Sequence, residues 1–101
     1  MTLRGELDIA EVPRLEQALD AAIADSEGAF LIDAYELEFL DSSGVRALLR
    51  ARAMLGREDR ALALVCAPGA VRRTLDVVGV SDLFMIYATR RDAERALVPC
   101  E

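Results

Sequence analysis

The turn Asp41-Ser42-Ser43-Gly44 is where the residue types of this chain are best suited to chemistry. An apolar run ends just before it and a helical pattern begins at it, so a helix should start there. The first backbone N–H groups of a helix have no partner inside the helix, and the helix dipole is positive at that end. The Ser42 hydroxyl can cap such a helix, and a phosphate carried on it would meet those donors. Capping alone and phosphorylation both fit these residues.

Catalysis on this chain would have to rely on carboxylates, because the sequence contains no histidine. The usual general base, the serine–histidine pair and most zinc sites are thereby excluded. Two pairs of acids stand out, Glu6 with Asp8 and Asp33 with Asp41, and a carboxylate hydrolase or a magnesium site is an alternative. No glycine-rich phosphate loop and no lysine accompany these acids. A solvated acidic rim is the simpler interpretation, and we expect no catalytic residue, metal ion or cofactor.

Length and charge restrict the class of protein. A chain of 101 residues is expected to form one domain, residues 1–101. Its net charge of −6 argues against nucleic acid or an anionic membrane as the partner. No apolar run approaches the roughly 20 residues of a transmembrane helix, and no targeting leader opens the chain, so we expect a cytoplasmic location. Cys66 and Cys100 lack metal or redox spacing and should be free thiols.

The elements that would position the turn alternate between strand and helix. Strands are expected at residues 2–7, 29–32, 61–66 and 84–87, where apolar runs are short. Helices are expected at residues 10–24, 43–55, 68–79 and 90–97, where helical spacing or helix-start residues occur. This alternation predicts an α/β fold with a mainly parallel sheet of about four strands, about four helices and right-handed crossovers.

Two expectations concern where side chains lie. The apolar run 29–32 is continuous and short, as in a buried parallel strand. That strand should therefore end at Asp33 and bring this carboxylate to the carboxyl edge of the sheet, where a phosphate on Ser42 would meet it. In the following helices, the spacing predicts core positions for Leu48, and for Val71, Leu75 and Val78.

Four segments, in order along the chain, resemble a STAS domain, and most closely the bacterial anti-sigma factor antagonists. Residues 3–8, LRGELD, resemble the family's strand end "TGELD", and residues 37–44, LEFLDSSG, resemble its phosphorylation turn. Residues 66–73, CAPGAVRR, resemble its third helix, and residues 78–84, VGVSDLF, resemble its exit into the last strand. The resemblance covers nearly the whole chain and implies the STAS fold.

The resemblance also implies a partner-switching function. In the antagonists, the serine directly after the aspartate is phosphorylated by a partner that is both an anti-sigma factor and a serine protein kinase; here that serine is Ser42. The unphosphorylated domain binds this partner and frees the sigma factor, and a metal-dependent serine phosphatase restores it. Asp8 matches the family's acidic residue in the loop beside the serine. The implied partner-binding residues are Asp8, Asp41, Ser42, Ser43, Gly44 and Arg46.

Two departures from the family pattern bear on the partner. Arg46 stands where the family often has a small residue, and this cation one turn after Ser42 could alter kinase docking or offset the charge of a phosphate. The family's first strand has no counterpart before residue 2. Either the natural start lies upstream or another chain completes the sheet edge, which leaves a homodimer open. As an alternative function, the chain would be a non-phosphorylated STAS subunit of a transport or stress-sensing complex.

Overall fold

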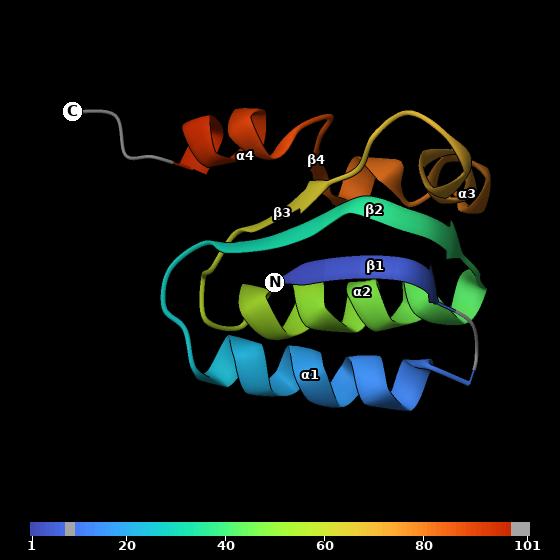
Figure 1. Ribbon diagram of the computed structural model, residues 1–101. Helices are drawn as coiled ribbons and strands as arrows, with labels where there is room; N and C mark the ends of the chain where they lie inside the picture. The colour runs from blue at the N-terminus through green and yellow to red at the C-terminus, as the bar shows by residue number, and fades with distance from the viewer. Residues whose placement is uncertain (8–9, 98–101) are drawn as a thin grey trace.

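The computed structural model describes residues 1–7 and 10–97 and shows an α/β fold (Figure 1). Within these residues, one sheet contains four parallel strands in the order β1-β2-β3-β4. The strands are β1 (Thr2–Leu7), β2 (Phe30–Leu40), β3 (Leu62–Val65) and β4 (Met85–Tyr87), and the helices are α1 (Val12–Ala24), α2 (Ser42–Gly56), α3 (Ala70–Val78) and α4 (Arg90–Leu97), with a 3-10 turn η1 (Ser81–Leu83) before β4. The predicted fold class is confirmed.

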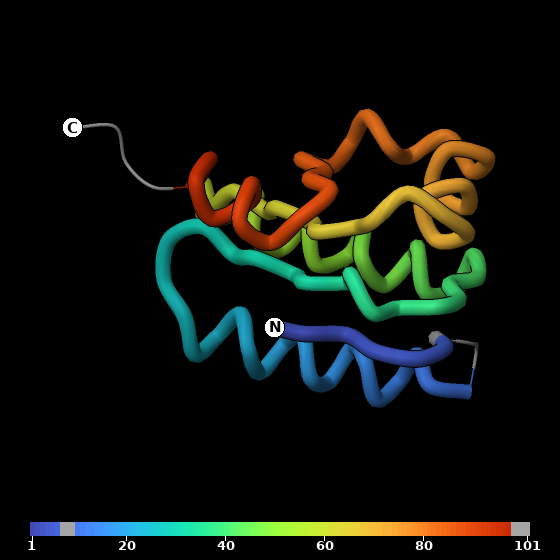
Figure 2. The backbone as a smooth tube through the Cα atoms, turned by 45° about the horizontal axis from the view of Figure 1, so that its top comes forward, coloured from blue at the N-terminus to red at the C-terminus, as the bar shows by residue number. Residues whose placement is uncertain are grey.

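Helices lie on both sides of the sheet. α1 and α2 pack side by side beneath it, α4 lies above it, and α3 lies above the carboxyl end of β2 (Figure 1 and Figure 2). Because the strands are parallel, their carboxyl ends meet at one end of the sheet, and α2 begins at that end. Strands β1 and β4 form the two edges of the sheet.

The core consists of the apolar helix faces that the spacing predicts. Leu15, Leu19 and Ile23 of α1 are buried, and so is Leu48 of α2. All four residues of β3 are buried, as expected for an interior parallel strand. These contacts fix the position of α2, and with it the position of the turn that precedes it.

Strand β2 is longer than its apolar run suggests, and the predicted end at Asp33 is wrong. The strand continues to Leu40 because β1 pairs along it, with Thr2 opposite Asp33 and Leu7 opposite Leu40. Two irregularities in this pairing place extra residues in β2, which lets Leu37 and Leu40 stay buried although they are three positions apart. At this end of β2 the buried residues are therefore three positions apart, and the sequence lacks the strict alternation of apolar and polar residues that indicates a strand.

The third helix differs from the expectation at both ends. It begins at Ala70, two residues after Pro68, and Val78 at its last position is 47% exposed, so the predicted core position of Val78 is wrong. Val71 and Leu75 are buried as predicted. Gly79 ends the helix with φ +84°, a left-handed conformation that glycine adopts without steric cost.

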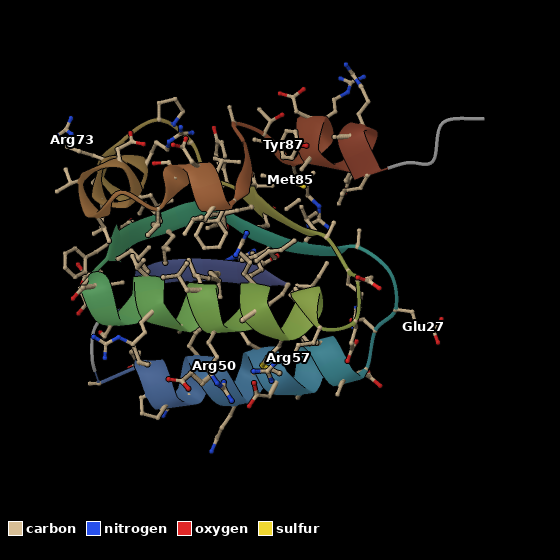
Figure 3. All side chains as sticks on the ribbon, turned by 180° about the vertical axis from the view of Figure 1, so that it is seen from behind. Glu27, Arg50, Arg57, Arg73, Met85 and Tyr87 are labelled. Atoms are coloured by element: carbon tan, nitrogen blue, oxygen red, sulfur yellow. The ribbon has the colours of Figure 1, made fainter. Side chains whose placement is uncertain are left out.

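A nearly buried arginine, which the sequence did not reveal, ties α1 to β3. The Arg60 side chain is 8% exposed and donates hydrogen bonds to the carbonyl oxygens of Ile23 (3.0 Å) and Gly28 (2.7 Å) and to the Ser26 hydroxyl (2.7 Å). It thereby binds one carbonyl oxygen in the last turn of α1 and one in the loop that follows this helix. A second link joins α2 to α1, where the two terminal guanidinium nitrogens of Arg50 donate to the two carboxylate oxygens of Asp20 at 2.9 and 3.1 Å. Figure 3 shows Arg50 beside α1.

Candidate phosphorylation site at the start of α2

Asp41, and not Ser42, caps α2. Its backbone is extended (φ −96°, ψ −178°), and its Oδ1 accepts hydrogen bonds from the Gly44 N–H at 3.0 Å and from the Ser43 hydroxyl at 2.5 Å. Ser42 is the first helical residue. The expectation that the Ser42 hydroxyl occupies the cap position is therefore wrong, because a carboxylate one residue earlier already accepts from the third N–H of the helix.

The two serines of the turn differ in their freedom to react. Ser42 is exposed, and within the described residues its hydroxyl has no hydrogen-bond partner. Ser43 is half-buried, and its hydroxyl is engaged by Asp41. An enzyme that modifies a hydroxyl at this turn therefore meets Ser42 first, without breaking the cap.

The backbone of the turn favours an anion on Ser42. The N–H groups of Ser42 and Ser43 have no partner within the helix, since the Gly44 N–H goes to the Asp41 side chain and the Val45 N–H to the Asp41 carbonyl (3.0 Å). The positive end of the helix dipole points at the same place. Gly44 and Val45 are buried, so the turn is held against the core while Ser42 faces solvent.

The cap residue Asp41 and Arg46 of α2 supply charged side chains next to Ser42, and the middle of β2 contributes none. Arg46 is exposed and lies one helical turn after Ser42, and the first turn of α2 contains no acidic residue. Asp33 lies eight residues before Asp41 along an extended chain, roughly 25 Å away. It pairs there with Arg90 of α4 at 3.6 Å, so it is not part of this site. Asp8, the other predicted acidic neighbour, lies outside the described residues.

An exposed apolar surface lies near the turn, and the sequence did not predict it. Phe39, three residues before Ser42, is 45% exposed, and Val77 and Val78 of α3 are 80% and 47% exposed. These three residues line a groove of about 350 Å³ together with Ala70, Arg73 and Thr74. Helical spacing assigns Val78 to the core, so the sequence carries no signal for this surface.

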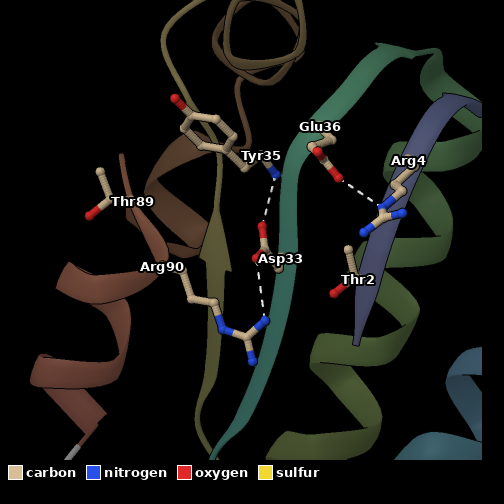
Figure 4. A pocket seen from close by; sticks show the side chains of 7 residues that line it. All are labelled: Thr2, Arg4, Asp33, Tyr35, Glu36, Thr89 and Arg90. Carbon is tan, nitrogen blue, oxygen red and sulfur yellow. Dashed lines mark hydrogen bonds and ion pairs between the residues drawn. The ribbon is translucent and has the colours of Figure 1, made fainter.

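A second hollow, of about 390 Å³, lies over the middle of β2 (Figure 4). Its charged side chains pair within the chain: Arg4 with Glu36 at 2.8 Å, and Arg90 with Asp33 at 3.6 Å. The Asp33 carboxylate also accepts from the Tyr35 N–H at 3.0 Å. This hollow is therefore lined by ion pairs, and it does not gather the acids that the sequence paired, since Asp33 and Asp41 are far apart.

Metal-binding clusters and membrane-spanning helices are both absent from the described residues. Among residues 1–7 and 10–97, no three Asp, Glu or Cys side chains lie close enough together to hold a metal ion. No helix in this part of the chain combines the length and hydrophobicity that crossing a bilayer requires. Cys66 is a free, buried thiol, as predicted, whereas Cys100 lies outside the described residues.

The fold and the turn together define a class of protein. A family model of the STAS domain matches residues 1–93, and the chain belongs to the STAS domain family. The resemblance found in the four sequence segments is thereby confirmed. The family match contains the sheet, α1 to α3 and the whole turn at the start of α2.

The relatives of the chain are anti-sigma factor antagonists. The anti-sigma-F factor antagonist RsfB of Mycobacterium tuberculosis is 28% identical over 93 residues, which span 92% of this chain and 75% of RsfB. The crystal structure of an anti-sigma factor antagonist from Mycobacterium paratuberculosis matches with a TM-score of 0.86 and 36% identity, covering 95% of this chain and 81% of that one. The antagonist SpoIIAA in its unphosphorylated form matches with a TM-score of 0.76 and 26% identity, covering 97% of this chain and 88% of SpoIIAA.

Proposed function

We propose that this protein is an anti-sigma factor antagonist that acts by partner switching, controlled by phosphorylation of Ser42. The observation that carries the proposal is the exposed Ser42 hydroxyl at the first position of α2, beside a cap that Asp41 provides, in a chain whose relatives are antagonists. In its unphosphorylated form, the protein binds an anti-sigma factor that is also a serine kinase. This binding frees the sigma factor for transcription. We expect the protein to act in the cytoplasm.

In the phosphorylation step, this chain supplies only the nucleophile. The Ser42 oxygen forms a bond to the γ-phosphorus of ATP held by the kinase, the bond from that phosphorus to the leaving ADP breaks, and the hydroxyl proton goes to a base of the kinase. Residues 1–101 thus act as a domain that is a substrate and a ligand, and not as an enzyme. A separate serine phosphatase hydrolyses the phosphoserine and returns the protein to its binding form.

Electrostatics explains how the phosphate would switch partners. It adds a charge of about −1.5 to −2 at pH 7 at the rim of a protein whose net charge is already −6. The free N–H groups of the first helical turn and the Arg46 guanidinium can hold that phosphate against the turn without a change of fold. A partner that rests on Ser42 would then face a bulky dianion where it had met a small hydroxyl, and it would dissociate.

Self-association belongs to the same proposal, because the outer edge of β1 is not paired with any other strand among the described residues. The antagonist function itself would operate with the protein as a monomer or as a dimer. The partner-binding residues that we propose are those of the turn, Asp41 to Gly44, together with Arg46 and Asp8.

The test measures phosphate and partner binding on matched variants. The protein is recovered from its own cells in growth and under stress, and phosphopeptides that contain residues 41–46 are identified by mass spectrometry. We expect phosphate on Ser42 whose occupancy changes with condition, and its loss in Ser42→Ala but not in Ser43→Ala. With the purified anti-sigma factor, Ser42→Ala should bind like the unphosphorylated protein and Ser42→Asp more weakly. Equal binding by both, with Ser42 always unmodified, would favour the non-phosphorylated subunit of a larger complex.

A further inference from the structure

One stripe of α3 faces solvent although most of its residues are apolar. Its members lie three and four positions apart along the helix: Ala70, Arg73, Thr74, Val77 and Val78. Val77 is 80% exposed, and Val78 is 47% exposed. The helix buries a different face against the protein. Because a solvent-facing stripe of a helix is usually polar, this stripe indicates contact with another molecule.

The stripe and the end of β2 together line the groove of about 350 Å³ described above, which we call the α3 groove. Phe39 lines it from β2 and is 45% exposed. The Thr74 hydroxyl donates to the Ala70 carbonyl oxygen at 3.0 Å, so it is already engaged within its own helix. The groove is therefore apolar apart from one guanidinium group, that of Arg73.

Arg73 is exposed, and within residues 1–7 and 10–97 its guanidinium group has no ion-pair partner. Its neighbour Arg72 differs, because it pairs with Asp76 at 3.3 Å. Figure 3 shows Arg73 at the outer side of α3. A free cation beside an apolar groove, in a chain of net charge −6, favours an occupant with apolar side chains and a carboxylate.

The α3 groove and the turn at Ser42 lie within reach of a single partner. Phe39 precedes Ser42 by three residues of a chain that is extended through Asp41, which places the two about 10 Å apart. A standard interface covers about 800 Å² on each protein, a patch roughly 30 Å across. A protein that rests on Ser42 can therefore cover Phe39 and the groove as well.

We propose that the α3 groove is a second docking site for the anti-sigma factor, and that it receives an apolar segment with an acidic residue that pairs with Arg73. The inference rests on the proposed function, because its partner is the one that Ser42 controls. The two surfaces have different roles. The groove supplies affinity in both states of Ser42, whereas the turn supplies the switch.

A second copy of this chain fits the groove less well. A twofold contact sets a surface against itself, so two Arg73 guanidinium groups would meet in a groove whose described lining contains no carboxylate. Two copies of net charge −6 also repel each other at long range. These charges favour a different protein that places a carboxylate at the groove.

Charge reversal at Arg73 tests the docking site. Binding of the purified anti-sigma factor to wild type, Arg73→Glu and Arg57→Glu is measured by isothermal titration calorimetry. We expect Arg73→Glu to raise the dissociation constant about tenfold. Arg57→Glu makes the same charge change at an exposed arginine at the other end of α2, and it should change the constant less than about twofold.

A second pair of variants tests the apolar part of the groove. Val77→Gln removes apolar surface from the groove and should weaken binding about five- to tenfold. Leu83→Gln makes a similar change at a side chain that is 45% exposed and lines a separate hollow with Gly56, at the far end of α2, and it should leave binding unchanged. Because Val77 is mostly exposed, Val77→Gln should keep the melting curve of wild type.

Ser42→Asp separates a failure of this proposal from a failure of the proposed function. The losses from Arg73→Glu and Ser42→Asp should multiply in the double variant, because the two sites act independently. If Ser42→Asp weakens binding while Arg73→Glu and Val77→Gln remain folded and bind like wild type, the docking site is overturned and the switch stands. If only the groove variants weaken binding, the docking site is supported and the switch fails. A wild-type dimer that Val77→Gln dissociates would assign the groove to a second copy and overturn the proposal.

Discussion

The assignment of the helix cap to Asp41 predicts that changes at two adjacent residues have very different effects on stability. Asp41→Ala removes the acceptor of the Gly44 N–H and of the Ser43 hydroxyl. Loss of an N-cap costs about 1 kcal/mol, and loss of a carboxylate at the positive end of the helix adds about 0.5 kcal/mol. Together these effects should lower the free energy of unfolding by about 1.5 kcal/mol and the Tm by about 6–12 °C.

Ser42→Ala should have almost no effect on stability by comparison. The side chain is exposed and its hydroxyl has no hydrogen-bond partner within the described residues, so the change should stay within about 0.5 kcal/mol. Asp41→Asn is the matched control, because an amide oxygen still caps the helix while the charge is lost. It should recover most of the loss seen in Asp41→Ala.

The assay is thermal and urea unfolding of the unphosphorylated variants, followed by circular dichroism. The order of stability should be wild type and Ser42→Ala first, Asp41→Asn next and Asp41→Ala last. If Ser42→Ala lowers the Tm more than Asp41→Ala does, then the Ser42 hydroxyl caps the helix and the assignment of the cap to Asp41 is refuted. In that case, a hydroxyl committed to the cap would also be a poorer kinase substrate.

Three further predictions concern the core and its buried groups. Leu48→Ala, which removes a fully buried side chain, should cost about 2–5 kcal/mol, and an unchanged melting curve would contradict the packing of α2. Arg60→Ala should cost about 2–4 kcal/mol because four hydrogen bonds of a charged, nearly buried group are lost. Arg60→Lys should recover only part of this stability, and full recovery would show that the charge alone matters. Burial raises the pKa of the Cys66 thiol above its usual 9.0, so the unfolded chain ionises first and stability should fall as the pH rises through about 9. This loss should be absent in Cys66→Ala, and rapid alkylation of native Cys66 at pH 8 would refute the assignment.

Periodicity in the sequence was sufficient to predict the helices and the class of fold. Leu15 and Leu19 of α1 and Leu48 of α2 each lie on the apolar face of their helix, and all three are buried. A helix covers the sheet with one face, and that face is apolar. The short run of β3 is apolar at every position, because both of its faces are covered. The position of the turn could be predicted too, since an apolar run ends just before Asp41 and a helical pattern begins just after it.

The length of β2 and the identity of the cap could not be predicted in this way. Beyond Asp33, β2 is held by pairing with β1, a segment more than thirty residues earlier in the chain, and its irregular register appears only when both strands are present. Asp41 and Ser42 are equally good cap residues in isolation. The backbone at the end of β2 decides between them, because it is still extended at Asp41 and helical from Ser42 onward.

The sequence by itself thus determined the family, the parallel α/β pattern and the short segment that contains the proposed phosphorylation site, because these depend on residue types and local spacing. Only the tertiary structure decided which hydroxyl faces solvent, which acids lie away from the turn, and where apolar and backbone groups remain open for partners. Those properties depend on contacts between residues far apart in the chain, such as Asp33 with Arg90, and local spacing carries no information about such contacts.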